Sequence, residues 1–289
     1  MGSLHSFFIK NNLMRLINKN TKICVSFASN PGNFGNYFHN YLFDKLNLNY
    51  IYKSFKTDSI KLSLLSLRNL GIRGCGISMP FKTEAIKYVD IMDQAVADIG
   101  SSNTVINEDG VLKAFNTDSY SIRKILIEEK LKKNLNILIK GSGGMANAII
   151  YTLKKLGFNN LNILARNKKT LSKILKKWSL TEIKQIDLSS QKFDLLINAT
   201  PLGMPNFTNE IPFEEEIILN SSIVMDVVVN PNGTKLSFLC KKNNIRLITG
   251  EMITKLQAKK QFELYTGHKL NKEIVEEAHQ FYMLKSKIK

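Results

Sequence analysis

The sequence predicts an α/β fold of two domains with a cleft between them, the second of which is a Rossmann-type, doubly wound domain. At roughly 150 residues per domain, the 289 residues suffice for about two domains. A hydrophobic share of 44%, with only 6 Pro and 16 Gly, excludes disordered and collagen-like chains. From Ile23 onward, short apolar runs alternate with longer segments of helical period, which is typical of βαβ units and a largely parallel sheet.

The first half of the chain is predicted to alternate strands with helices and then to form a hairpin. Apolar residues recur at three- and four-residue intervals over residues 34–46 and 58–70, which predicts two amphipathic helices. Apolar runs at residues 23–27, 49–53 and 74–78 are predicted to be strands. Residues 103–107 and 111–116 flank Glu108-Asp109-Gly110, and Asp-Gly between two apolar runs indicates a β-hairpin.

A more regular series of strands and helices begins near Asn134. Its helices are expected to start near Gly144, Thr170 and Thr234, and its five strands at 136–140, 162–165, 194–198, 223–228 and 246–249. Two further helices follow from Glu251, split at residues 266–268, and no strand is left for them to accompany. We therefore expect them to return to the first half, so that residues 1–118 and 254–289 form one domain and residues 119–253 the other.

The chain is strongly basic, with 41 Lys+Arg against 24 Asp+Glu, a formal net charge of +17 and a pI of about 9.6. Such a pI raises the question of a nucleic-acid partner. The lysines are scattered along the chain, however, and Lys, Asn and Ile are enriched together, as biased coding composition produces. We therefore expect no nucleic-acid partner, and a milder use of the charge in drawing anionic small molecules toward a cleft.

The cysteines bear on compartment and metal binding. Cys24, Cys75 and Cys240 lie far apart and follow no disulfide or zinc-ligand spacing, which predicts free thiols in a reducing cytosol and no metal site. No apolar run approaches the roughly 18 residues of a membrane span. We expect a cytoplasmic monomer or homodimer that has no membrane partner.

A glycine-rich turn indicates a dinucleotide site. The strand predicted at residues 136–140 runs directly into six small or flexible residues at the start of a helix, namely Gly141, Ser142, Gly143, Gly144, Met145 and Ala146. Small residues let the backbone approach a pyrophosphate, whose charge meets free N–H groups and the helix N-terminus. The alternative is a glycine turn that serves only tight packing.

The end of the next strand favours NADP over NAD. NAD-binding versions of this turn place an Asp or Glu there to bind the ribose 2′-hydroxyl. Here the strand leads into Arg166, Asn167, Lys168 and Lys169, without a carboxylate. A guanidinium grips a 2′-phosphate with a planar fork and a neighbouring ammonium adds charge. The alternative is that these are ordinary exposed cations at a helix start.

Two polar groups of residues in the first half indicate a site for chemistry. Residues 78–82, Ser-Met-Pro-Phe-Lys, follow a strand and are expected to enter a helix. Residues 102–104 and 116–118 lie at the two ends of the hairpin and are therefore expected to be close in space. A lysine and an aspartate among amides and hydroxyls would suit a polyhydroxylated carboxylic acid, with the Lys/Asp pair handling a proton.

These motifs together resemble the shikimate dehydrogenase family, over nearly the whole chain from about Thr21. They occur in that family's order, at residues 78–82, 102–104, 116–118, 141–144, 198–204, 226–228 with Asn230-Pro231, and Gln257-Ala258 with 262–264. The resemblance implies an NADP-dependent dehydrogenase of shikimate or a related cyclic hydroxy acid, with a substrate domain and an NADP-binding domain.

The resemblance also implies roles for individual residues. Lys82 and Asp118 match the catalytic pair, although a free lysine, with a pKa of about 10.4, is a poor base at neutral pH, which leaves the role of Lys82 partly open. Matches to substrate-binding positions are Ser78, Asn103, Gln257 and, at the carboxylate end, Asn33. Matches to the nicotinamide side are Thr200, Leu202, Met204 and Gly250.

The sequence departs from the family pattern where the substrate carboxylate is held. The usual Ser-x-Ser pair is replaced by Asn33 and Gly35, an Asn by Gly76, and a Tyr by Val229. The usual Gly-x-Gly-Met reads as residues 250–253, Gly-Glu-Met-Ile. The chain thus resembles the divergent shikimate-dehydrogenase-like subgroup. These losses leave open an alternative, a non-catalytic or regulatory protein that binds NADP or a shikimate-like ligand.

Overall fold

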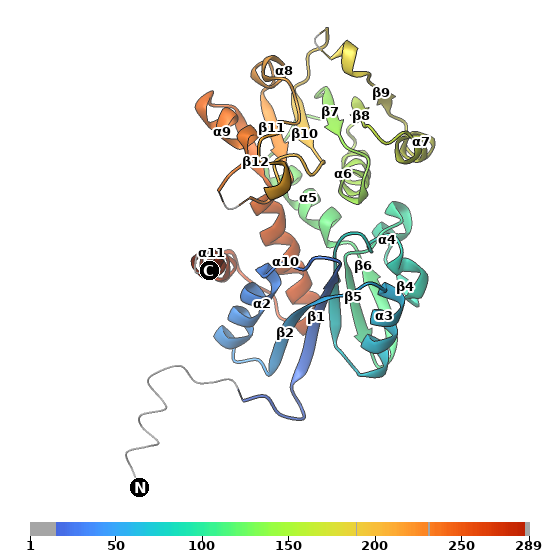
Figure 1. Ribbon diagram of the computed structural model, residues 1–289, viewed down its shortest axis with the longest axis vertical. Coiled ribbons are helices and arrows are strands. Elements are labelled where there is room, and N and C mark those ends of the chain that lie inside the picture. The colour runs from blue at the N-terminus through green and yellow to red at the C-terminus, as the bar shows by residue number, and fades with distance from the viewer. Residues whose placement is uncertain (1–15, 189, 231, 287–289) are drawn as a thin grey trace.

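The computed structural model describes residues 16–188, 190–230 and 232–286. Within these ranges the strands form two six-stranded sheets, each built from a separate part of the chain. Figure 1 shows the two sheets toward opposite ends of the molecule, with helices α5 (Thr117–Glu128) and α10 (Gly250–Thr266) between them. The predicted α/β fold class is confirmed, whereas the predicted domain bounds stay a prediction and their first 15 and last three residues lie outside the described ranges.

The first sheet has the strand order β2-β1-β3-β5-β6-β4. Its strands are β1 (Lys22–Ala28), β2 (Tyr50–Lys56), β3 (Gly74–Ile77), β4 (Ile91–Met92), β5 (Thr104–Glu108) and β6 (Val111–Phe115). β1 pairs in parallel with β2 and β3, but β5 runs antiparallel to β3 and β6. The sheet is therefore mixed, because the hairpin turns back at Asp109 and Gly110, whose positive φ angles of 51° and 89° suit a two-residue hairpin turn.

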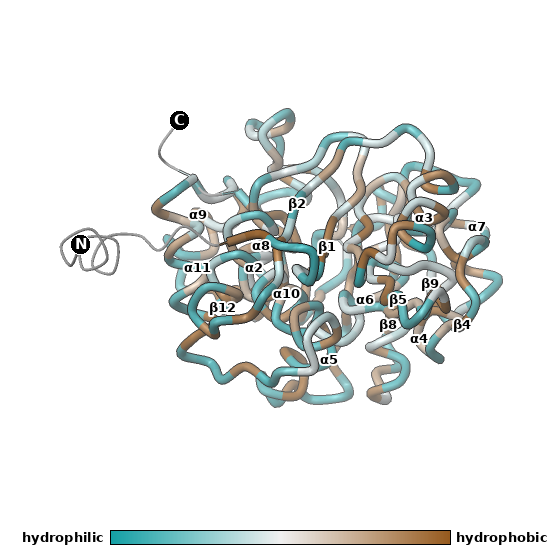
Figure 2. Tube along the Cα trace, turned by 90° about the horizontal axis from the view of Figure 1, so that it is seen from below, coloured by the Kyte–Doolittle hydropathy of each residue, from teal (hydrophilic) through white to brown (hydrophobic). Residues whose placement is uncertain are grey.

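Helices cover both faces of the first sheet. α2 (Phe34–Lys45), α10 and α11 (Lys272–Ser286) share one apolar cluster with β1 and β2, and α3 (Ile60–Asn69) belongs to another cluster with β1, β3 and β5. Viewed from below in Figure 2, α2, α10 and α11 gather on one side of β1. A short helix, α4 (Gln94–Ile99), joins β4 to the hairpin.

The second sheet is parallel throughout, with the order β12-β11-β10-β7-β8-β9. Its strands are β7 (Ile137–Lys140), β8 (Leu161–Leu164), β9 (Thr181–Glu182), β10 (Leu195–Asn198), β11 (Ile223–Asp226) and β12 (Arg246–Thr249). Its helices are α6 (Gly144–Lys155), α7 (Lys168–Lys177), α8 (Glu215–Leu219) and α9 (Lys235–Lys242). Counted from β7 as strand one, this is the 3-2-1-4-5-6 order of a Rossmann fold, which reverses between β7 and β10.

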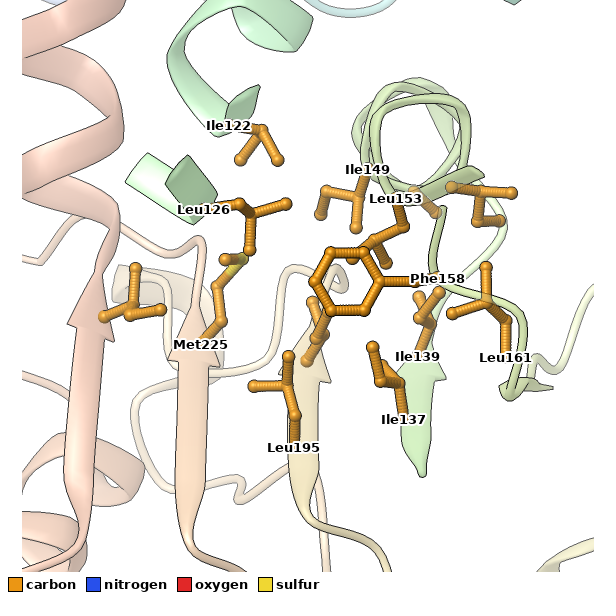
Figure 3. Packing of buried hydrophobic residues seen from close by; sticks show 14 of the residues in the cluster. Ile122, Leu126, Ile137, Ile139, Ile149, Leu153, Phe158, Leu161, Leu195 and Met225 are labelled. Atoms are coloured by element: carbon orange, nitrogen blue, oxygen red, sulfur yellow. The ribbon is translucent and has the colours of Figure 1, made fainter. Parts of the chain in front are cut away.

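The core of the second sheet follows from the spacing of side chains in a strand and in a helix. Ile137 and Ile139, two residues apart, lie on one face of β7, and Ile149 and Leu153, four residues apart, lie on one face of α6. These side chains surround Phe158, and all five are fully buried (Figure 3). This packing fixes α6, and with it the glycine turn at its N-terminus, above the end of β7.

The last two helices return to the first sheet, as the sequence predicts. α10 begins at the residue after β12 and contacts α5, α2 and β5, and α11 contacts α2. The chain therefore crosses between the two sheets twice, once along α5 and once along α10.

Candidate active site

A lysine–aspartate pair lies where the first sheet meets α5. Lys82 Nζ donates a hydrogen bond to Asp118 Oδ2 at 2.6 Å, and the side chains are 19% and 2% exposed. Asp118 lies in the first turn of α5, whereas Lys82 lies in a turn over residues 79–84. The helix expected at Lys82 is thus absent, and the turn leads instead into a 3-10 helix at Ala85–Tyr88.

The two ends of the hairpin hold this pair in place. The Ser102 backbone N–H donates to the Lys82 carbonyl at 2.9 Å. Asn103 Oδ1 accepts from the Thr117 backbone N–H at 2.8 Å, and the Asn116 side chain caps α5 by accepting from Ser119. The structure therefore brings together residues 102–104 and 116–118, as their positions at the hairpin ends predict.

The site presents one open acceptor and one open donor. In the part of the chain that the structure describes, Asp118 Oδ1 and Asn103 Nδ2 are buried and have no hydrogen-bond partner. Buried polar atoms are almost always hydrogen-bonded in native proteins, because an unpaired one costs about 1 to 3 kcal/mol. A carboxylate oxygen and an amide N–H left open beside the Lys82 ammonium are suited to the hydroxyls of a ligand. Ser78, at the end of β3, is exposed beside this turn.

Helix α10 adds a glutamine that the sequence did not single out. Gln261 Nε2 donates to the Asn103 carbonyl at 3.2 Å and to Thr104 Oγ1 at 3.0 Å, and Gln261 is 7% exposed. Gln257, the predicted residue, lies half-buried one turn earlier on the same face of α10. The four-residue spacing between Gln257 and Gln261 indicates that both lie on one face of a helix. The hydrogen-bond partners of Gln261, however, depend on tertiary packing and cannot be derived from that spacing.

The glycine turn lies at the point where the strand order of the second sheet reverses. Gly141 has a φ of +123°, and a Cβ there would lie 2.6 Å from the Ala199 carbonyl oxygen, so this position requires glycine. A Cβ on Gly143 or Gly144 would meet no other heavy atom within 4 Å. Gly143 and Gly144 thus leave open space at the start of α6, where a pyrophosphate could approach.

The other residues of the turn are fixed by contacts with their neighbours. Ser142 Oγ lies 2.6 Å from Thr170 Oγ1 on α7, which ties the turn to the next helix. Ala146 is fully buried in the core of the second sheet, and Met145 is half-buried and packs against that core.

Cations gather beside this turn. Burial, and then the nearby Arg166 guanidinium, lowers the pKa of the Lys140 ammonium, which donates to the Pro212 carbonyl. Arg166 is exposed just before α7. Lys168, also exposed, bonds Glu182 at 3.0 Å, so part of its charge is already balanced. Two like charges that destabilise each other would both be stabilised by an anion between them.

The loop after β10 is held by a buried amide. Asn198 is fully buried, and its Oδ1 accepts from Thr200 Oγ1 at 2.6 Å while its Nδ2 donates to the Leu202 carbonyl and to Asp226 Oδ1. This fixes the loop that carries the predicted residues Thr200, Leu202 and Met204. Burial raises the pKa of Asp226, which also accepts from Thr234 Oγ1 at 2.7 Å.

Gly250 marks where the second sheet passes into α10. It is buried, and a Cβ there would lie 2.5 Å from the carbonyl oxygens of both Val227 and Val228. The backbone of α10 therefore starts in direct contact with the residues after β11.

A cavity of about 300 Å³ is lined by Val229, one of the positions that depart from the family pattern, but not by Asn33, Gly35 or Gly76. Among its lining residues are Phe34, Val229, Gly250, Thr254, His279 and Tyr282, from α2, the segment after β11, α10 and α11. Asn33 is exposed at the start of α2 and accepts from Asn36 Nδ2 at 3.1 Å. Neither Lys82 nor Asp118 lines this cavity.

The described residues contain neither a group of metal ligands nor a membrane-spanning helix. Within residues 16–188, 190–230 and 232–286, no three His, Cys, Asp or Glu side chains are grouped as metal ligands would be. In the same ranges, no helix combines the length and the apolar character needed to cross a membrane.

The parallel 3-2-1-4-5-6 sheet, its glycine turn and the Lys82–Asp118 pair define a two-sheet α/β protein with a dinucleotide-type half and a polar site on the other half. Residues 35–105 match the model of the shikimate dehydrogenase substrate binding domain. The chain is 39% identical over 268 residues to a shikimate dehydrogenase-like protein of Haemophilus influenzae, covering 92% of this chain and 98% of that one. It is 33% identical over 279 residues to the shikimate dehydrogenase (NADP(+)) of Methanocaldococcus jannaschii, covering 91% and 98%.

Solved structures agree with these relatives. The structure of a shikimate 5-dehydrogenase-like protein has 39% sequence identity and a TM-score of 0.86, covering 92% of this chain and 99% of that one. A shikimate dehydrogenase in complex with NADP+ has 30% identity and a TM-score of 0.83, covering 94% and 99%. The chain belongs to the shikimate dehydrogenase family.

Proposed function

We propose that the protein is an NADP-dependent dehydrogenase that interconverts a ring hydroxyl and a ring ketone, either of shikimate and 3-dehydroshikimate or of a related cyclic hydroxy acid. The observation that carries the proposal is the Lys82–Asp118 pair with the open Asp118 Oδ1 and Asn103 Nδ2 beside it. A proton donor, a hydroxyl acceptor and an amide donor at one buried point are what such a ring requires.

The second sheet has the features that the coenzyme requires. Gly143 and Gly144 leave room for a pyrophosphate at the start of α6, and Arg166 beside Lys140 offers charge for a 2′-phosphate. No carboxylate follows β8 to favour NAD. The relatives named as NADP(+) enzymes support the same coenzyme. NADP, when bound, accepts or supplies the hydride.

The chain itself handles the proton. In the direction of ketone reduction, the Lys82 ammonium can donate a proton to the carbonyl oxygen of the substrate as the hydride arrives. Asp118 Oδ2 orients that ammonium at 2.6 Å, and Asp118 Oδ1 remains free to accept from the resulting hydroxyl. In the direction of oxidation, the neutral amine of Lys82 would accept the hydroxyl proton as the hydride leaves the ring. Lys82 is thus the proposed acid/base, and Asp118 the residue that orients both ammonium and substrate.

The proposed substrate contacts divide by element. Asn103 Nδ2 offers a donor to a ring hydroxyl. Ser78, exposed after β3, and Gln257, half-buried on α10, are proposed as further substrate contacts. Of the two residues that replace the usual Ser-x-Ser pair, only Asn33 has a polar side chain, and it is exposed at the start of α2. We expect carboxylate binding to be weaker or rearranged, since an unmet partner costs about 1 to 3 kcal/mol.

A substrate panel tests the proposal. Purified full chain is assayed with NADP and shikimate, quinate or aminated analogues, following formation of the reduced coenzyme. We expect turnover of at least one of them, and a loss of roughly 100-fold or more in kcat for Lys82→Ala. Lys87→Ala is the matched control, since Lys87 is exposed on the neighbouring 3-10 helix. Correctly folded protein that oxidises no member of the panel would contradict the proposal.

The same assay separates the alternative of a binding module. Asn33, Gly35 and Val229 motivate it, because they remove hydroxyl donors from the carboxylate end. A module would bind NADP or the ring acids, as measured by calorimetry, without turning them over. Turnover that disappears in Lys82→Ala excludes it.

A further inference from the structure

The last residues of four neighbouring strands of the second sheet form one row with a cation and a carboxylate in it. The row consists of Lys140 on β7, Asn198 on β10, Asp226 on β11 and Thr249 on β12, which pair in register. Residues in register on parallel strands point their side chains to the same face of the sheet. Two strand spacings of about 4.8 Å place Asp226 about 10 Å from Lys140, on the far side of the point where the strand order reverses.

The carboxylate of this row is buried and has only neutral partners. Asp226 is 2% exposed. Its Oδ1 accepts from Asn198 Nδ2 at 2.9 Å and from the Val228 backbone N–H at 3.2 Å, and its Oδ2 accepts from Thr234 Oγ1 at 2.7 Å. Within residues 16–188, 190–230 and 232–286 no ion pair includes Asp226, and burial raises its pKa. A buried carboxylate without a counter-ion is stabilised by a cation that binds nearby.

Asp226 is joined to the residues predicted to line the nicotinamide side. Its partner Asn198 also accepts from Thr200 Oγ1 at 2.6 Å and donates to the Leu202 carbonyl at 3.1 Å. Asp226 and Gly250 both line the cavity of about 300 Å³. The negative charge is therefore placed at the half of the sheet where we expect the nicotinamide ring.

The order of charges in the row matches the order of charges in the coenzyme. The nicotinamide ring is a cation in NADP+ and neutral in NADPH, whereas the 2′-phosphate is anionic in both. Lys140, with Arg166 near it, lies toward the proposed phosphate position, and Asp226 lies toward the ring. We propose that the Asp226 carboxylate is a specificity determinant that strengthens the binding of NADP+ relative to that of NADPH. The inference rests on the proposed function, since it takes the coenzyme to be NADP.

A bias in the direction of the reaction follows. Ketone reduction moves a hydride, with both electrons of its C–H bond, from NADPH to the ring carbon of the substrate, while the carbonyl oxygen takes a proton from Lys82. The coenzyme is left as NADP+, whose positive ring the Asp226 carboxylate stabilises. Bound hydroxy acid with NADP+ is thus favoured over bound ketone with NADPH.

Asp226→Asn tests this, because the side chain keeps its size and loses its charge. The dissociation constants of NADP+ and NADPH are measured by calorimetry on the full chain without ring substrate, so that no turnover is needed. We expect Kd for NADP+ to rise roughly 10- to 100-fold, the factor for unit charges about 6 to 12 Å apart at an effective dielectric constant of about 20. Kd for NADPH should change less than about threefold.

Two controls accompany the measurement. Asp187→Asn removes the same charge from an exposed residue of the second half and should alter neither dissociation constant. Adenosine 2′,5′-bisphosphate lacks the nicotinamide ring and should bind wild type and Asp226→Asn alike. If Asp226→Asn does not fold, as thermal unfolding would show, Asp226→Ser provides the same comparison, because it also removes the charge and keeps an oxygen.

The outcomes separate this inference from the proposed function. Equal changes in Kd for NADP+ and NADPH, or no change in either, overturn the role of the charge, because a residue that only shapes the loop affects both forms; turnover by the wild type then still upholds the dehydrogenase. A wild type that binds both forms but oxidises no panel member contradicts the dehydrogenase, and the two dissociation constants still decide the inference. A wild type that binds neither form overturns both.

Discussion

The glycine turn after β7 offers a paired test that separates folding from coenzyme binding. Gly141→Ala and Gly143→Ala add the same methyl group two residues apart. At Gly141 the backbone has a φ of +123° and the methyl would lie 2.6 Å from the Ala199 carbonyl oxygen. At Gly143 the φ is −84° and no other heavy atom lies within 4 Å of the methyl. The first change is therefore expected to affect the fold, and the second the coenzyme.

The magnitudes follow from those contacts. Gly141→Ala combines an unfavourable φ, at about 1 to 3 kcal/mol, with overpacking against a backbone atom, at about 1 to 3 kcal/mol. The backbone around it cannot relax easily, because Gly141 N–H donates to the Leu164 carbonyl and Ala199 N–H to the Lys140 carbonyl, both at 2.9 Å. We expect a loss of about 2 to 6 kcal/mol in the free energy of unfolding, and a fall in Tm of roughly 2 to 4 °C for each kcal/mol lost. Gly143→Ala, at the N-cap of α6, should cost less than about 1 kcal/mol.

The assays are thermal unfolding and steady-state kinetics at varied NADP. Gly143→Ala should raise KM for NADP by roughly 10-fold or more, because the methyl fills the space in which a pyrophosphate would approach the helix. KM for the ring substrate at saturating NADP should stay unchanged. Two results would refute the reasoning: a Gly141→Ala protein as stable as the wild type, or a Gly143→Ala protein with an unaltered KM for NADP.

Three further predictions concern buried polar groups. Asp118→Asn, which keeps the size of the side chain but not its charge beside Lys82, should lower kcat by roughly 100-fold or more; a kcat within tenfold of wild type would remove Asp118 from the mechanism. Tyr265→Phe deletes a buried hydroxyl that has no partner among the described residues, so urea unfolding should show unchanged or higher stability, by up to about 1 to 3 kcal/mol; a clear loss would mean that the hydroxyl is bonded. Burial lowers the pKa of His39 to about 3 from 6.5, so the unfolded chain takes up this proton first and stability is lost as pH falls below about 6.5. From about pH 7.5 to about pH 5 this amounts to roughly 2 kcal/mol, a dependence that His39→Phe should remove and that exposed His268→Phe should retain.

Local patterns carried much of the fold prediction. The alternation of strands and helices from residue 136 gave the parallel second sheet, because each of its elements buries a face whose period can be read from the residues alone. Asp109-Gly110 marked the hairpin for a similar reason, since two consecutive positive φ angles favour those residue types. That hairpin in turn brought Asn103 and Asp118 to one place.

Features without a local pattern were not predicted. β4 and β9 have two residues each, too few for an alternation to be visible. The turn at Lys82 was expected to begin a helix, because one polar and one apolar residue after a proline do not distinguish a turn from a first helical turn. Gln261 on α10 contacts residues of the hairpin that are far away in the chain, so its place beside the site could be seen only in the folded structure.

Helix α10 connects the two halves between which the proposed reaction would take place. Its first residue, Gly250, lies against the carbonyls of Val227 and Val228 in the second sheet, and Gln261, eleven residues later, bonds Asn103 and Thr104 in the first. At 1.5 Å per residue this is a rigid span of roughly 16 Å. Asp118 is on α5, which packs along the same helix. The separation between the coenzyme half and the proton-handling pair is therefore set by one continuous helix. A change in the middle of α10 should therefore alter the position of NADP relative to the ring substrate more than it alters the binding of either molecule.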